Sequence, residues 1–149
     1  IMAMFLVLFR SLKIAFIAIL PSMLASGSVL GLMGWLGIPL DVMTITIAAI
    51  CIGIGVDHSI HYIHRFRSEI KRQASARIAI EKSHASTGKA IYYTSVIIVV
   101  GFSILGLSNF IPTIYFGVFT AFAMLVSLIA NLTLLPLLLL GINSGKIKT

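Results

Sequence analysis

The sequence has very little charge, and least of all negative charge. Only 10% of its 149 residues are charged and four are Asp or Glu, whereas 59% are hydrophobic. A soluble domain needs a much larger charged fraction to keep its surface hydrated. The composition therefore excludes an ordinary soluble protein and indicates a chain that lies in a membrane.

Cysteine is also scarce, and strand-like alternation is missing. The single cysteine, Cys51, lies in an apolar run, so it can form no internal disulfide and is expected to serve packing. The apolar runs have about the 20 residues that a spanning helix needs, and they do not alternate as the strands of a β-barrel do. We therefore predict an all-α membrane protein built as a helical transmembrane bundle.

Four spans are predicted, at about 14–36, 42–63, 90–107 and 113–140. Residues 1–9 are too short to span, and we interpret them as the remnant of a helix whose start lies outside the sequence. Between the second and third spans, Phe66, Ile70, Ala74 and Ile78 recur every four residues among Arg and Lys. This pattern favours a short amphipathic helix over 66–86 at the cytoplasmic interface, with a solvated loop as the alternative.

The basic residues lie in alternate connections. The turns at 37–41 and 108–112 contain no Lys or Arg. When the crossings are counted, all eleven Lys and Arg residues fall on one side of the membrane, which the positive-inside rule assigns to the cytoplasm. The net charge of +7 is thus explained by topology, and we expect no nucleic-acid partner.

Asp57 is the only acid inside a predicted span. It precedes Arg65 by eight residues, which places it roughly 12 Å from the cytoplasmic end of its helix. An ionised carboxylate there costs at least about 2.5–3.5 kcal/mol on insertion scales, so such a residue by default marks a proton or ion path. We favour a proton relay, with a purely structural hydrogen-bond partner as the alternative.

The neighbours of Asp57 fit a relay. Gly53 and Gly55 remove side-chain bulk near the acid, so that a helix or water can approach. His61, one turn further on, is placed to pass protons toward the cytoplasm. Helical spacing puts the following residues near one face: Thr46, Ile50, Gly53, Asp57 and His61. Thr46 and His58 are possible polar partners of the acid.

Three histidines also raise the possibility of a metal site. His58, His61 and His64 are spaced by three residues and spread over about 120° of the helix, which suits three ligands on one ion poorly. We therefore expect no metal, no cofactor and no enzymatic activity. A histidine–metal membrane enzyme is kept as a third, less favoured hypothesis.

Several motifs resemble one known family. Residues 52–67, IGIGVDHSIHYIHRFR, are similar to the fourth-helix motif of the MMPL-type (mycobacterial-membrane-protein-large) branch of the RND superfamily. Residues 87–91, TGKAI, resemble the start of that family's next helix, and residues 108–112, SNFIP, continue the match in order. Further matching pairs are Thr94-Ser95, Gly101-Phe102, Phe116-Gly117 and Leu135-Pro136. The sterol-sensing domains of Patched-like proteins share this architecture.

The resemblance implies an exporter of lipids or other hydrophobic molecules in the bacterial inner membrane, driven by proton influx. It also implies twelve helices in two repeats of six, of which this chain would be about one repeat. The expected partners are membrane lipids, a hydrophobic substrate and the second repeat, from the same polypeptide or another copy. Asp57 would be the proton relay, and this chain has His58 where many members have Tyr or a second Asp.

One alternative of a different class remains open. A sterol-sensing-like module would bind lipid for regulation without transporting it. Proton-dependent movement of substrate would distinguish the exporter from such a module.

The arrangement of the basic residues makes a direct prediction about topology. Reporter domains fused after Arg72 and after Lys148 should both report a cytoplasmic location, and one near Asp41 a periplasmic location. Paired alkaline phosphatase and green fluorescent protein fusions measure this. A periplasmic signal after Arg72 would contradict the predicted number of crossings.

Overall fold

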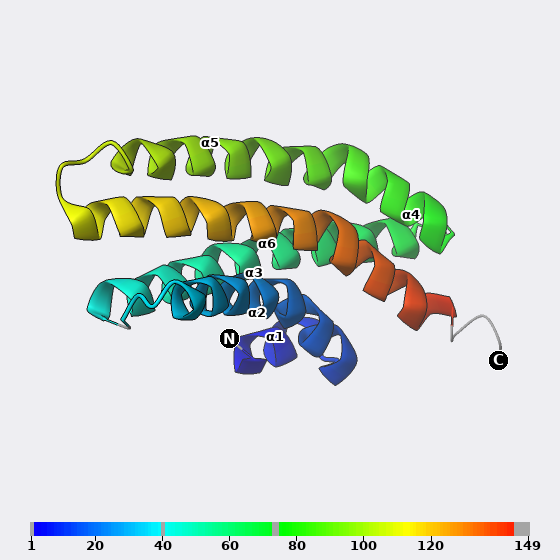
Figure 1. Cartoon of the computed structure of the whole chain (residues 1–149). Coiled ribbons are helices and arrows are strands. Elements are labelled where there is room, and N and C mark those ends of the chain that lie inside the picture. The colour runs from blue at the N-terminus through cyan, green and yellow to red at the C-terminus, as the bar shows by residue number, and fades with distance from the viewer. Residues whose placement is uncertain (1, 40, 73–74, 145–149) are drawn as a thin grey trace.

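The computed structural model describes residues 2–39, 41–72 and 75–144, and within these ranges every regular element is a helix. In chain order they are α1 (Met2–Phe9), α2 (Leu12–Trp35), α3 (Val42–Lys71), α4 (Ala76–Ser83), a π-helical turn η1 (His84–Gly88), α5 (Lys89–Leu105) and α6 (Ile111–Ser144). Figure 1 shows the long helices running side by side.

In the described part of the chain, four helical segments are long and apolar enough to cross a membrane: Leu12–Trp35, Thr44–Lys71, Ala76–Leu105 and Ile111–Gly141. The predicted fold class, an all-α membrane bundle, is therefore confirmed. The third segment joins α4, η1 and α5 into one bent helix, as Figure 1 shows.

Local sequence signals explain the turn between α2 and α3. Gly37 takes a φ of +68° just after α2, a conformation that glycine adopts without strain, and the amide of Ile38 returns to the carbonyl of Met33 at 3.0 Å. α3 then begins with a capping box, in which Asp41 and Thr44 each accept a hydrogen bond from the other's backbone amide. These two caps make a short turn at one end of the bundle.

Helix α6 is the centre of the packing. It contacts α2, α3 and α5, whereas α5 packs mainly against α6 and lies at the edge of the bundle (Figure 1). Apolar side chains fill two clusters, one around Tyr62 and Phe66 toward the basic end and one around Met33 and Met124 toward the other. Cys51 is fully buried in the second cluster, in agreement with the packing role expected for it.

The structure differs from the prediction of a separate amphipathic helix over 66–86. α3 continues past the span to Lys71, and α4 begins at Ala76 as the first part of the bent third segment. The spacing of Phe66 and Ile70 suits this continuation equally well, because both pack into the same core as the span before them. Ala74, part of that pattern, lies outside the described residues.

The two turns without Lys or Arg lie at the same end of the bundle (Figure 1). The start of α2, the end of α3, α4 and the start of α5 meet at the opposite end and carry the basic residues of the described chain. Lys146 and Lys148 lie outside the described part. This arrangement separates charge along the bundle axis as a membrane span requires.

The contact between α5 and α6 gives a prediction about stability. A Cβ at Gly117 would lie 2.6 Å from Leu105 Cβ and 2.6 Å from the Phe102 carbonyl oxygen. Gly117→Ala should force the helices apart and lower the free energy of unfolding by about 1–3 kcal/mol, the usual cost of overpacking. Thermal melts in detergent, followed by circular dichroism, measure this effect.

The matched control is Gly101→Ala on α5, where a Cβ would meet nothing within 4 Å. It should leave the melt unchanged or raise its midpoint slightly, since Ala is the better helix former. Equal melting midpoints for the two variants would show that the α5–α6 approach is not tight.

Candidate functional site

Helix α3 has a packed face and an open face. Ile47, Cys51 and Ser59 are fully buried on the face that meets α2 and α6. The residues predicted to share a face with Asp57 do so on the other side, where they are exposed or half-buried: Thr46, Ile50, Gly53, Asp57 and His61. This open face of α3 is where we place the candidate site.

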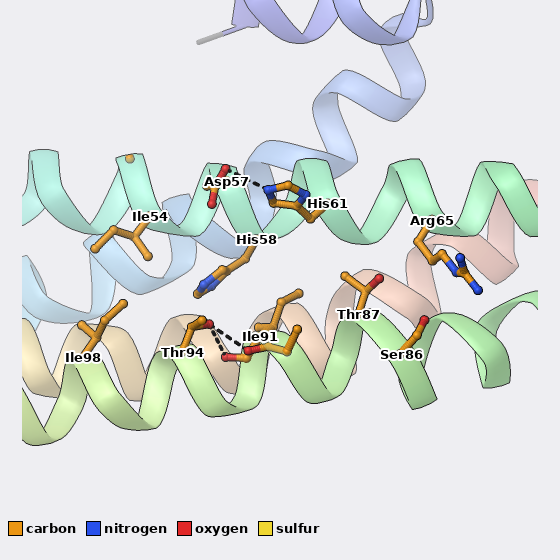
Figure 2. Close-up of a pocket in the computed structure, with 12 residues that line it drawn as sticks. Ile54, Asp57, His58, His61, Arg65, Ser86, Thr87, Ile91, Thr94 and Ile98 are labelled. Atoms are coloured by element: carbon orange, nitrogen blue, oxygen red, sulfur yellow. Dashed lines mark hydrogen bonds and ion pairs between the residues drawn. The ribbon is translucent and has the colours of Figure 1, made fainter.

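Asp57 and His61 meet on the open face. His61 Nε2 lies 3.4 Å from Asp57 Oδ1, and about two thirds of each side chain is exposed, 66% for His61 and 65% for Asp57. Figure 2 shows the pair on α3, among the residues that line a pocket between α3 and α5. The contact joins a carboxylate to an imidazole across one helical turn, and a proton can be exchanged between two such groups.

The two glycines predicted to open space beside Asp57 lie in different places. Gly53 shares the exposed face, and a Cβ added there would meet nothing within 4 Å. Gly55 is buried on the packed face, where a Cβ would lie 2.7 Å from Ser22 Oγ and 3.0 Å from Ser127 Oγ. Gly55 therefore lets α2 and α6 approach α3, and it leaves no space beside the acid.

Thr46 is not a partner of Asp57. Its hydroxyl donates to the Val42 carbonyl at 2.7 Å, and eleven residues of helix separate it from the acid by about 16 Å. The face is shared, but the distance along the helix is too great for contact.

His58 points into a groove between α3 and α5 (Figure 2). Its side chain is buried and its Nδ1 has no hydrogen-bond partner among the described residues. The groove has a volume of about 750 Å³, and isoleucine side chains alternate along it with polar ones such as His58 and Thr94. Asp57, His58 and His61 therefore all line this groove.

Sequence reasoning missed a buried acid. Glu69 is 1% exposed, and its carboxylate lies 2.8 Å from Arg65 Nη2, 3.9 Å from Arg72 Nη1 and 3.8 Å from Lys82 Nζ. The cluster ties the end of α3 to α4. The available signal was the spacing by four between Arg65 and Glu69, which brings an acid and a base together on a helix.

A second buried contact crosses the bundle. Ser59 Oγ donates to Asn131 Oδ1 of α6 at 2.9 Å, and Asn131 Nδ2 donates to the Ser127 carbonyl at 2.9 Å. Both Ser59 and Asn131 are fully buried. Hydrogen bonds of this kind link helices where no water is present, so this contact fixes the rotation of α3 and hence the direction of Asp57.

The histidines do not form a metal centre in this structure. Across residues 2–39, 41–72 and 75–144, no three His, Cys, Asp or Glu side chains come together as a group that could hold an ion. His61 contacts Asp57, His58 faces α5, and His64 is exposed.

A multi-pass helical membrane protein with a carboxylate on one open face is the class that the fold and site define. The sequence profile of the MMPL family matches residues 1–145, and the chain belongs to that family.

Two relatives extend the comparison. MJ1562 of Methanocaldococcus jannaschii, named only as a candidate membrane protein, is 32% identical over 139 residues, which are 93% of this chain and 36% of the relative. YdgH of Bacillus subtilis, named in the same way, is 31% identical over 148 residues, 96% of this chain and 17% of the relative. The chain thus spans about a third and a sixth of the lengths of these two proteins.

Proposed function

We propose that the chain is part of a proton-driven exporter of lipids or other hydrophobic molecules in the bacterial inner membrane, with its basic end in the cytoplasm. Asp57 is the proton relay of this exporter. The observation that supports the proposal most strongly is the Asp57–His61 pair, which lies inside a span on a face that no other helix of the described chain covers.

The exposure of that face supports a second bundle as partner. A carboxylate facing hydrocarbon costs several kcal/mol, so the working protein must cover it with polar groups or water. The relatives are long enough for a second set of helices, since the chain spans 36% and 17% of them. In the proposal, a second repeat, from the same polypeptide or another copy, packs on the open face of α3.

The geometry suggests how the proton would move. Protonated Asp57 donates through Oδ1 to His61 Nε2, which lies 3.4 Å away, and leaves a carboxylate and an imidazolium. His61 lies one turn nearer the basic end and releases the proton there, which restores the neutral imidazole. The emptied carboxylate is then ready to take the next proton from the opposite side.

A regulatory module that binds lipid without moving it is the competing function. The groove between α3 and α5 favours it, because a space of this size can hold a lipid molecule without any proton transfer at Asp57. The two functions differ in whether protonation of Asp57 matters for the movement of substrate.

Asp57→Asn in the complete protein tests the proposal. The amide keeps the shape and removes a costly charge, so insertion and expression should stay near normal while efflux falls to background. His61→Ala should slow efflux less, because it removes the exit step and leaves the loading site. The measurement is efflux of a fluorescent hydrophobic probe from energised vesicles, normalised to protein.

Asp41→Asn is the matched control. It makes the same chemical change at the cap of α3, outside the span, and Asn caps a helix as well as Asp. Its efflux should equal that of the unmodified protein. Near-normal efflux with Asp57→Asn would mean that the acid is structural, and the regulatory module would become the better account.

A further inference from the structure

The Ser59 hydroxyl has two acceptors within hydrogen-bonding distance. Its oxygen lies 2.9 Å from Asn131 Oδ1 of α6 and 3.1 Å from the Gly55 carbonyl oxygen of its own helix. A serine hydroxyl carries one hydrogen, so it donates fully to only one of the two at a time. The contact between α3 and α6 can therefore open while Ser59 keeps a hydrogen bond, because the donor turns to the carbonyl one helical turn back.

The amide of Asn131 is held in place by its own helix. Its Nδ2 donates to the Ser127 carbonyl at 2.9 Å and lies 3.3 Å from Ser127 Oγ. Asn131 is fully buried inside a span, where an amide is tolerated only when hydrogen bonds satisfy it. α6 thus presents a fixed acceptor to α3, and the Ser59 hydroxyl is the part of the contact that can change.

The surfaces around this contact are small enough for α3 to move against its neighbours. Gly55 lies one turn from Ser59 on the same packed face, and a Cβ there would lie 2.7 Å from Ser22 Oγ and 3.0 Å from Ser127 Oγ. At this level α3 presents no side chain, and α2 and α6 present hydroxyls, so small sliding or turning movements meet little obstruction. The Ser22 hydroxyl is fully buried and makes no hydrogen bond among the described residues, so a donor is available there when polar groups rearrange.

The place of Ser59 in the helix connects this contact to the relay. Ser59 lies two residues after Asp57 and two before His61, so a helix of 3.6 residues per turn puts it almost opposite both. A turn of α3 by about 20° would carry a carboxylate at the rim of the helix by roughly 2 Å. The bond that holds Ser59 therefore also determines what Asp57 faces.

We propose that Ser59 is a positioning residue that lets α3 take two rotational positions, one with its hydroxyl on Asn131 and the other with its hydroxyl on the Gly55 carbonyl. The inference rests on the proposed function for the role of Asp57. A relay that loads a proton on one side and releases it on the other needs two surroundings for its carboxylate, and the two positions of α3 supply them.

Spin labels on the two flanks of the open face test the proposal. Ala49 and Ile54 lie on either side of Asp57, about 140° apart around α3, so a rotation uncovers one and covers the other. The measurement is the collision rate with oxygen of a nitroxide at each position. It is made on the complete protein in membranes, in a Cys51→Ala background.

Ser59→Ala and Asn131→Leu each remove the bond between α3 and α6. In both variants one collision rate should rise and the other fall, because α3 turns as a unit. The ratio of the two rates should change by about threefold, the shift in population that one cross-helix hydrogen bond of average strength in a membrane controls. An unchanged ratio in both variants would overturn the proposal.

Ser26→Ala is the matched control. It removes a buried hydroxyl of α2 that donates within its own helix, to the Ser22 carbonyl at 3.0 Å, so the ratio should stay unchanged. An equal change with Ser26→Ala, or rates that rise at both labelled positions, would show general loosening and overturn the proposal as well. No transport is measured, so efflux with Asp57→Asn tests the exporter separately.

Discussion

Hydrocarbon cannot solvate a charge, and this constraint arranges every polar group of the bundle. Basic side chains gather at one end, where head groups and water meet the helices. Glu69, an acid at the same end, is buried but lies within 4 Å of three cations. Asp57 alone has only a histidine beside it, and the need to solvate its carboxylate determines what else the working protein must contain.

The packing of α6 connects this constraint to the two surfaces of α3. The Ser59–Asn131 hydrogen bond and the close approach at Gly55 hold one face of α3 against α6 and α2. α5 reaches α6 closely because Gly117 has no side chain, and it therefore sits beside α6 instead of closing on α3. One open face carries the acid, and the space toward α5 becomes the groove.

Much of the fold could be predicted from the sequence, because each span corresponds to a long apolar run. The face that carries Asp57 and His61 was also predictable, since helical spacing alone places them together. The end of α3 could not be predicted in the same way. The apolar spacing at Phe66 and Ile70 fits both a separate interfacial helix and a continued span.

The sequence could not distinguish the roles of residues of the same type that lie on different faces of a helix. Gly53 and Gly55 are two positions apart and lie on opposite faces, so one is open and the other is packed against Ser22. From the sequence alone, Glu69 could equally be a solvated surface charge, because only the fold brings Lys82 beside it. The groove depends on how far α5 stands from α3, which no local pattern specifies.

The central claim is that the open face of α3 is an internal surface of the complete protein. A nitroxide label at Gly53, where a side chain has free space, reports on this face directly, in a Cys51→Ala background. Its collision rate with oxygen in membranes should fall well below that of a lipid label at the same depth. A collision rate equal to that of the lipid label would mean that Asp57 lies on a lipid-facing surface, and would contradict the account.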